Sequence, residues 1–132
     1  VVVAHRLERD GGARRQVGLA AAALGLGDNA TATRAIAAAR SAPDVTAMNY
    51  ITLASMFELL GDLPAALTVL REGQDRFGAA EPFLTHRARI LRAMNREAEL
   101  RQTLEDCQRT ANGQIDSACA DAARPGRRPL GL

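Results

Sequence analysis

Residues 47–78 read AMNYITLASMFELLGDLPAALTVLREGQDRFG, two apolar stretches joined at Gly61-Asp62. Before this pair, apolar residues follow the i, i+3, i+4, i+7 spacing of a helix with one buried face, at Leu53, Ala54, Phe57 and Leu60. A second stripe follows the pair, at Ala66, Leu67, Leu70 and Gly73. Gly61 can end the first helix in a left-handed conformation, and Asp62 can cap the second. The stretch therefore predicts a helical hairpin.

The hairpin signal recurs at a constant interval, at Gly27-Asp28, Gly61-Asp62 and Asn95-Arg96. Repetition of one hairpin signal at a fixed spacing in the sequence is typical of helical repeat proteins. We expect Asp28, Asp62 and Asn95 to cap the second helix of their hairpins, and Pro43-Asp44 and Pro82 to open the next hairpins. The predicted helices span residues 13–26, 29–40, 45–60, 63–76, 81–94 and 97–111.

These features resemble the tetratricopeptide repeat (TPR) family, although other αα-hairpin repeats remain an alternative. The middle unit matches best, at Tyr50, Leu53, Ala54, Phe57, Leu60, Gly61, Leu63, Ala66, Leu70 and Gly73. The sequence departs from the family pattern at Gly78, where Pro is usual, and at Gln16 and Arg87, where apolar residues are expected. The resemblance implies an all-α fold, an α-α superhelix of three TPR-like helical hairpins plus a C-terminal capping helix.

The expected organisation has three parts. Residues 1–12 form an N-terminal segment, a possible remnant of an upstream helix cut by Gly11-Gly12. Residues 13–123 form the TPR-like domain, with repeats at 13–46, 47–80 and 81–114 and a capping helix at 115–123, because repeat arrays need a polar end. Residues 124–132 form a flexible basic tail. The first residue is Val, so we expect the chain to be a fragment or a processed product.

Composition limits the function classes. The chain of 132 residues is 47% hydrophobic but only 3% aromatic, which favours a core of small aliphatic residues in packed helices. Its 17 basic residues are all arginine, which suggests a GC-rich bacterial genome. Up to residue 123 there are 14 arginines against 15 acids, a net charge of −1, which argues against nucleic-acid binding. No apolar run is long enough for a membrane span.

No catalytic or cofactor motif is present. The two histidines, His5 and His86, fall in different segments and have no local partner that suggests a triad. The two cysteines are too far apart in sequence for a metal site. We therefore predict that the chain is not an enzyme and binds no cofactor and no metal.

The TPR resemblance implies that the first helix of each hairpin lines a concave groove that holds a protein or peptide segment. The implied groove residues are Arg14, Val17, Ala21, Leu24, Met48, Ile51, Ser55, Glu58, Leu59, Pro82, Thr85, Arg89, Arg92 and Ala93. The groove would be apolar at one end and basic at the other, where Arg89, Arg92 and Arg96 form a stripe. The alternative is a solvated stripe paired with Glu97, Glu99 or Glu58. The Lys and Asn residues of chaperone-binding relatives are missing from the groove, so capture of a chaperone tail is not expected.

Cys107 and Cys119 lie at equal distances on either side of Gly113. A helical hairpin turning at Gly113 would bring the two thiols together, so a disulfide is one reading. Two small buried thiols in a reducing cytosol is the other. These two readings also imply different cellular compartments. A disulfide favours the periplasm or cell envelope, and free thiols favour the cytoplasm.

The sequence thus predicts a protein-interaction or scaffolding module that holds a partner segment in its groove. The alternative is an accessory TPR domain of a larger protein, such as an envelope protease or a secretion-related protein, whose catalytic part lies elsewhere. The partner and the oligomeric state are not indicated by any residue pattern.

Overall fold

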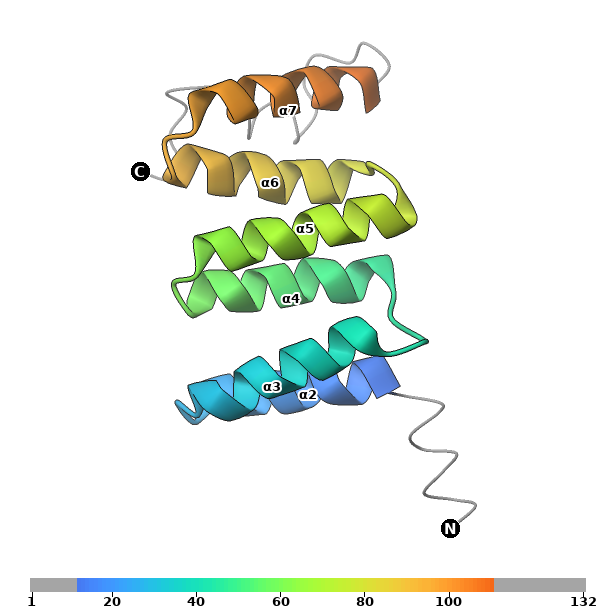
Figure 1. Ribbon diagram of the computed structural model, residues 1–132, viewed down its shortest axis with the longest axis vertical. Helices are drawn as coiled ribbons and strands as arrows, with labels where there is room; N and C mark the ends of the chain where they lie inside the picture. The colour runs from blue at the N-terminus through green and yellow to red at the C-terminus, as the bar shows by residue number, and fades with distance from the viewer. Residues whose placement is uncertain (1–11, 111–132) are drawn as a thin grey trace, which may run out of the picture. The chain divides into compact units, whose positions relative to one another are not determined.

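The computed structural model describes residues 12–110, and this part of the chain is all-helical, without strands (Figure 1). Its helices are α2 (Gly12–Gly25), α3 (Asn29–Ser41), α4 (Ala47–Leu59), α5 (Leu63–Phe77), α6 (Glu81–Ala93) and α7 (Glu97–Thr110). The all-α prediction is confirmed, and every predicted helix end lies within two residues of the observed one. None of these helices is long and apolar enough to cross a membrane.

Several predicted parts lie outside the described residues. These are the capping helix 115–123, the tail 124–132 and the N-terminal segment up to Gly11. Gly12 is described, and it is the first residue of α2. The expectation that Gly11-Gly12 ends an earlier helix concerns the residues before Gly12, so it stays a prediction.

The chain divides into two compact units, Val1–Val69 and Leu70–Leu132, and the boundary falls inside α5. In the first unit α2 packs against α3, and both contact α4. In the second unit α6 packs against α7 (Figure 1). The boundary lies within the predicted repeat 47–80, not between two repeats.

The three helical corners repeat one set of backbone hydrogen bonds at the interval predicted from the sequence. At the first corner Gly27 has a φ of 77°, its N–H donates to the Leu24 carbonyl (3.1 Å), and the Asp28 N–H donates to the Ala23 carbonyl (2.8 Å). The matching bonds run from Gly61 to Glu58 (3.0 Å), Asp62 to Phe57 (2.9 Å), Asn95 to Arg92 (3.0 Å) and Arg96 to Leu91 (3.0 Å). This pair of bonds is the Schellman motif, which satisfies the last carbonyls of a helix.

Asn95 plays a different part from the one expected. It has a φ of 56°, so it takes the left-handed place that Gly27 and Gly61 take at the other corners. Asparagine tolerates this conformation better than most residues with a Cβ atom. At the third corner, Arg96 and not Asn95 occupies the position that Asp28 occupies at the first corner, where Asp28 caps α3. The prediction that Asn95 caps the third hairpin is therefore wrong.

The other predicted caps of these corners are confirmed. The Asp28 carboxylate accepts from the Thr31 N–H (3.1 Å) and from the Thr31 hydroxyl (2.6 Å). The Asp62 carboxylate accepts from the Ala65 N–H (3.1 Å). Each bond satisfies a donor that the first turn of a helix leaves without a partner in the helix.

Helix α4 begins later than predicted, because Thr46 caps it instead of the Pro43-Asp44 pair. The Thr46 side chain accepts from the Asn49 N–H (3.1 Å), and the Asn49 side chain accepts from the Thr46 N–H (2.9 Å). This reciprocal capping box fixes the helix start at Ala47.

Asp44 instead caps α2, which begins far earlier in the chain. Its Oδ1 atom accepts from the Ala13 N–H at the start of α2 (3.0 Å). The approach is close, since a Cβ atom placed on Gly12 would lie 3.3 Å from the same oxygen. Glycine at position 12 therefore leaves room for the Asp44 carboxylate, which ties the loop after α3 to the start of α2.

Replacing Asp44 by Ala is expected to lower the free energy of unfolding by about 1 kcal/mol, the usual cost of losing an N-terminal cap. Asp44→Asn keeps an oxygen acceptor at the same place and is the matched control, with a loss of less than about 0.5 kcal/mol. Urea denaturation followed by circular dichroism measures both values. Equal losses in the two variants would contradict the cap.

Several alanines are fully buried in the first unit. Ala20, Ala32 and Ala39 are fully buried where α2 packs against α3. Larger buried side chains fill the rest of this unit, among them Ile36, Tyr50 and Leu53. Small and large side chains together therefore fill the core of this unit.

Candidate binding surface

A hollow of about 530 Å³ lies between α2 and α4, at the C-terminal ends of both helices. We call it the α2–α4 hollow. Its lining residues are Ala21, Leu24, Gly25, Asn29, Met56, Leu59 and Leu60. Ala21, Leu24 and Leu59 are residues that the TPR resemblance placed in the groove, so the structure brings these three together.

Leu59 is the most unusual residue of the α2–α4 hollow, because its side chain is 80% exposed. A single exposed leucine is common on protein surfaces. Leu59, however, shares a concave surface with Leu24 and Met56 and is next to Leu60. An apolar, concave surface is the usual form of a binding site.

The other predicted groove residues of the first unit differ in exposure. Met48 is 65% exposed, and Val17, Ser55 and Glu58 are half-buried. The Ser55 hydroxyl donates to the Ile51 carbonyl within the helix (3.2 Å). Ile51 is only 8% exposed, so it contributes to packing more than to a binding surface.

Sequence reasoning missed four residues of the α2–α4 hollow: Gly25, Asn29, Met56 and Leu60. Leu60 was assigned to the buried stripe of its helix, but it is half-buried and lines the hollow. The available signal was the pair Leu59-Leu60 directly before Gly61.

Three carboxylates stand near the α2–α4 hollow in the sequence. Asp28 precedes the lining residue Asn29, Glu58 precedes Leu59, and Asp62 follows Leu60 by two residues. The hydrogen bonds from the Thr31 hydroxyl and N–H hold the pKa of Asp28 below its usual range. Asp28 is therefore ionised at neutral pH, and its contribution to stability is lost as the pH falls through the lowered pKa.

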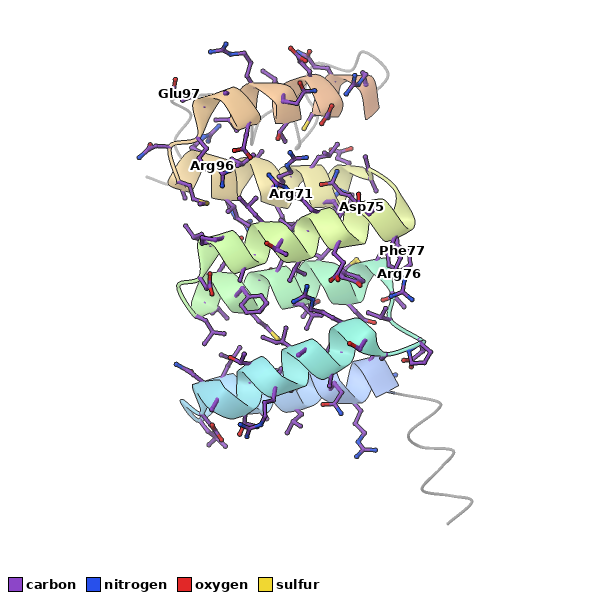
Figure 2. The ribbon with its side chains drawn as sticks, viewed as in Figure 1. Arg71, Asp75, Arg76, Phe77, Arg96 and Glu97 are labelled. Atoms are coloured by element: carbon purple, nitrogen blue, oxygen red, sulfur yellow. The ribbon has the colours of Figure 1, made fainter. Side chains whose placement is uncertain are left out.

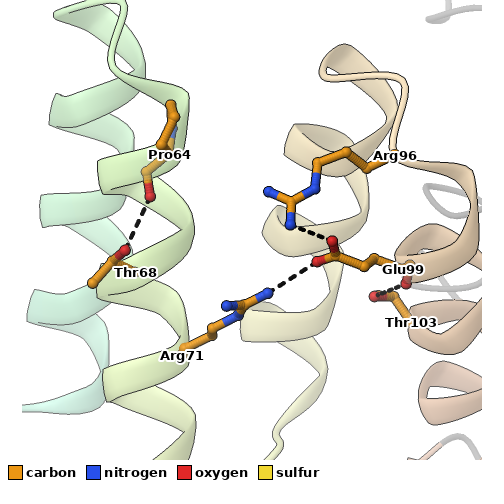
Figure 3. Close-up of polar contacts among 6 residues, drawn as sticks. All are labelled: Pro64, Thr68, Arg71, Arg96, Glu99 and Thr103. Carbon is orange, nitrogen blue, oxygen red and sulfur yellow. Dashed lines mark hydrogen bonds and ion pairs between the residues drawn. The ribbon is translucent and has the colours of Figure 1, made fainter.

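In the second unit, the predicted basic stripe is partly neutralised. Arg96 forms an ion pair with Glu99, and Glu99 also accepts from Arg71 (2.9 Å), as Figure 3 shows. Arg89 is exposed, and its Nη2 atom lies 2.8 Å from Nδ1 of His86. The predicted pairing of the stripe with Glu99 is thus observed at Arg96.

Two further predicted groove residues of this unit, Thr85 and Arg92, are half-buried. The Thr85 hydroxyl donates to the Glu81 carbonyl one turn earlier (2.9 Å). This bond lies within α6 and uses the hydroxyl proton, so the Thr85 oxygen remains only as an acceptor.

Arg87 replaces an apolar residue of the family pattern, and the structure places it among charges. Burial and the charge of Arg71 lower the pKa of Arg87, while Asp106 and Glu99 raise it. Its Nε atom is buried without a hydrogen-bond partner within residues 12–110. Figure 2 shows Arg71 on α5 and Arg96 at the turn before α7. The ion pair between Arg71 and Glu99 thus joins α5 to α7, and Arg87 of α6 lies within the electrostatic influence of both residues.

Cys107 lies in the core of the second unit. It is fully buried, packs with Leu84 and is disulfide-bonded. The only other cysteine of the chain, Cys119, lies outside the described residues, so its pairing with Cys107 stays a prediction. Within residues 12–110, no group of three His, Cys, Asp or Glu side chains is placed to hold a metal ion.

Comparison with protein-family models, with curated proteins and with solved structures found no match to the chain. The α2–α4 hollow combines a concave shape with an exposed large apolar side chain, that of Leu59. A second, smaller hollow of about 270 Å³ in the same unit includes Arg15 and Gln16 in its lining but no large apolar residue.

Proposed function

We propose that this chain is a protein-interaction module built from TPR-like helical hairpins, and that it binds an apolar segment of a partner protein in the α2–α4 hollow. The observation that carries the proposal is Leu59, 80% exposed on a concave apolar surface. Keeping such a leucine in water forgoes the free energy of its burial, about 1.5–3 kcal/mol. A partner that covers Leu59 recovers this free energy.

Two further observations support the TPR-like part of the proposal. The Schellman corners at Gly27, Gly61 and Asn95 recur at equal intervals with the same bonds. The hollow lies between α2 and α4, the helices to which the family resemblance assigns the groove. The nearby acids Asp28 and Asp62 cap helices, and the proposed role of the module is that of a scaffold.

Substitution of Leu59 by Glu is expected to weaken partner binding at least about tenfold, since it places a charge in the apolar contact. The binding partners are peptides selected on the immobilised chain from a random display library. Fluorescence anisotropy then gives their Kd values for the chain and the variant. Because Leu59 is exposed, the variant should keep its helical content and its unfolding midpoint.

Leu19→Glu is the matched control for this experiment. Leu19 lies on α2, is 49% exposed and does not line the α2–α4 hollow. It should therefore leave the Kd of the selected peptides unchanged. The proposal fails when Leu59→Glu has no effect on the Kd, or when Leu19→Glu weakens binding as much.

A further inference from the structure

We propose that a second copy of this chain packs against α2 in the antiparallel direction, and that Leu26 of each copy enters a hollow beside Arg15 of the other copy. The surface involved is the exposed face of α2 on the side away from the α2–α4 hollow. This self-association goes beyond the proposed function and leaves the α2–α4 hollow open to its partner.

Helix α2 is apolar on more sides than the described helices around it cover. Residues 17–26 contain no charged and no polar side chain. Ala20 and Ala23 are buried in the unit that α2 forms with α3 and α4. Leu19, however, is 49% exposed and Leu26 is 86% exposed. A helix that is apolar all round is typically buried all round, so we expect a partner on this face of α2.

Four exposed residues form one line along this face, Arg15, Leu19, Ala22 and Leu26, and we call them the α2 stripe. Their spacing places them within ~60° around the helix axis. Leu26 follows the last residue of α2, but its N–H still donates to the Ala22 carbonyl (3.1 Å), so it continues the helical path. The α2 residues that line the α2–α4 hollow lie ~90° or more from the middle of this stripe.

The α2 stripe is complementary to itself. Its members are four, three and four residues apart, a spacing that reads the same in both directions. An antiparallel copy therefore places Leu19 against Ala22 of the second copy, and Arg15 against its Leu26. Each leucine then meets a small side chain or the methylene stem of an arginine. Reciprocal contacts of this kind, residue i with j and j with i, define a two-fold dimer.

A hollow beside Arg15 supplies the place for Leu26 of the second copy. It has a volume of about 270 Å³, lies between the start of α2 and the end of α3, and is called here the α2–α3 hollow. Its lining residues are Gly12, Arg15, Gln16, Ala38, Ala42 and Pro43. The volume is just below the ~300–1,000 Å³ of sites for small ligands, so it suits a single side chain. The alanines, the proline and the arginine stem offer that side chain apolar contacts.

The backbone that carries Leu26 is fixed before any contact forms. The Leu26 N–H donates to the carbonyls of Ala22 and Ala23 (both 3.1 Å). The next residue, Gly27, takes the left-handed conformation of the first corner, and the Asp28 N–H closes the corner on the Ala23 carbonyl (2.8 Å). A side chain on a preorganised backbone loses less conformational entropy on binding, which favours Leu26 as the inserted residue.

The charges of α2 favour the antiparallel over the parallel orientation. Arg14 and Arg15 lie in the first turn of α2, and that turn has no acidic residue. A parallel pair would bring the arginines of both copies together, and like charges in an interface are unfavourable. The antiparallel register separates the two Arg15 residues by eleven positions, ~16 Å of helix. This distance exceeds the screening length of ~8–10 Å at physiological salt.

Sedimentation equilibrium of the full chain over a series of concentrations tests the self-association. One helix from each copy is expected to bury less than the ~1,200 Å² of a stable complex, so the dimer should have a Kd in the micromolar range. Leu26→Glu should raise this Kd at least about tenfold, because it places a charge in the α2–α3 hollow. The matched control is Met48→Glu, at a 65% exposed residue of the same unit outside the α2 stripe, and it should leave the Kd unchanged.

Disulfide cross-linking tests the orientation. The variants Arg15→Cys and Leu26→Cys are oxidised separately and as a mixture, with the unsubstituted chain as the control for the native cysteines. The antiparallel register brings the two substituted positions together, so cross-linked dimers should form in the mixture and not in either variant alone. Like positions lie ~16 Å apart along the helix, too far for a disulfide.

The outcomes decide this inference separately from the proposed function. A chain that stays monomeric, a dimer that Leu26→Glu does not weaken, or cross-linking of either variant alone overturns the inference. A dimer that Leu59→Glu abolishes does the same, because it places the contact in the α2–α4 hollow. Leu19→Glu should weaken the dimer and leave the Kd of the display-selected peptides unchanged, so each proposal can fail while the other stands.

Discussion

Replacing Leu53 by Ala is expected to lower the free energy of unfolding by about 2–5 kcal/mol, whereas Leu59→Ala should change it by less than about 0.5 kcal/mol. Both leucines belong to α4. Leu53 is fully buried, so its truncation removes apolar contacts and leaves a cavity. Leu59 is 80% exposed and loses little packing.

Urea denaturation of the two variants measures the difference in the free energy of unfolding. Both variants replace Leu by Ala in the same helix, so the change in helix propensity is the same and the lost contacts account for the difference. The slope of the free energy with urea should stay constant, which shows that stability and not compactness has changed. Similar losses for the two variants would mean that Leu59 is packed in solution. That result would also remove the main support for the α2–α4 hollow as a binding surface.

Much of the fold was predictable because its signals are local. The Gly-Asp pairs at positions 27 and 61 mark the helix ends, since each Gly takes a left-handed φ and each Asp caps the next helix. The apolar stripes give the buried faces of α4 and α5 by their spacing alone. These residues act on neighbours a few positions away, so one sequence suffices to read them.

The incorrect predictions of helix caps have a different physical origin. Asp44 caps α2 across a long stretch of chain, and only the packing of the first hairpin brings its carboxylate to Ala13. The period placed Asn95 at a corner, but it did not separate a left-handed residue from a cap, because asparagine suits both roles.

The candidate site was predicted only in part, for the same reason. Helical spacing assigns a residue to a face of its own helix, but a neighbouring helix decides whether that face is covered. Ile51 was expected in the groove and is buried, whereas Leu60 was expected in the core and lines the hollow. The fit of Met56 against α2 residues is likewise a property of two helices together.

Reduction of the disulfide at Cys107 is expected to destabilise the second unit by about 2–3 kcal/mol, the value for a bridge that closes a short loop. The predicted partner is Cys119, the only other cysteine of the chain. Thermal unfolding with and without a thiol-free reductant measures the effect. The loss should appear in the melting of α6 and α7, because Cys107 packs with Leu84 between them.

Cys119→Ser is the control for this prediction. It removes the bond while leaving the buried Cys107 side chain in place, so its melting temperature should equal that of the reduced chain and should not respond to reductant. Alkylation of both cysteines in the native, unreduced chain would show that no bridge forms. Equal responses of the chain and the variant to reductant would contradict a stabilising role.

The repeated corners have a consequence for how this architecture can change in length. Every backbone bond at Gly27, Gly61 and Asn95 closes between residues that are near neighbours in the sequence. A duplication or deletion of one repeat-length segment would therefore leave each remaining corner chemically complete. Only the surfaces on either side of the junction would need to adapt, so such a chain can gain or lose a hairpin in a single genetic step.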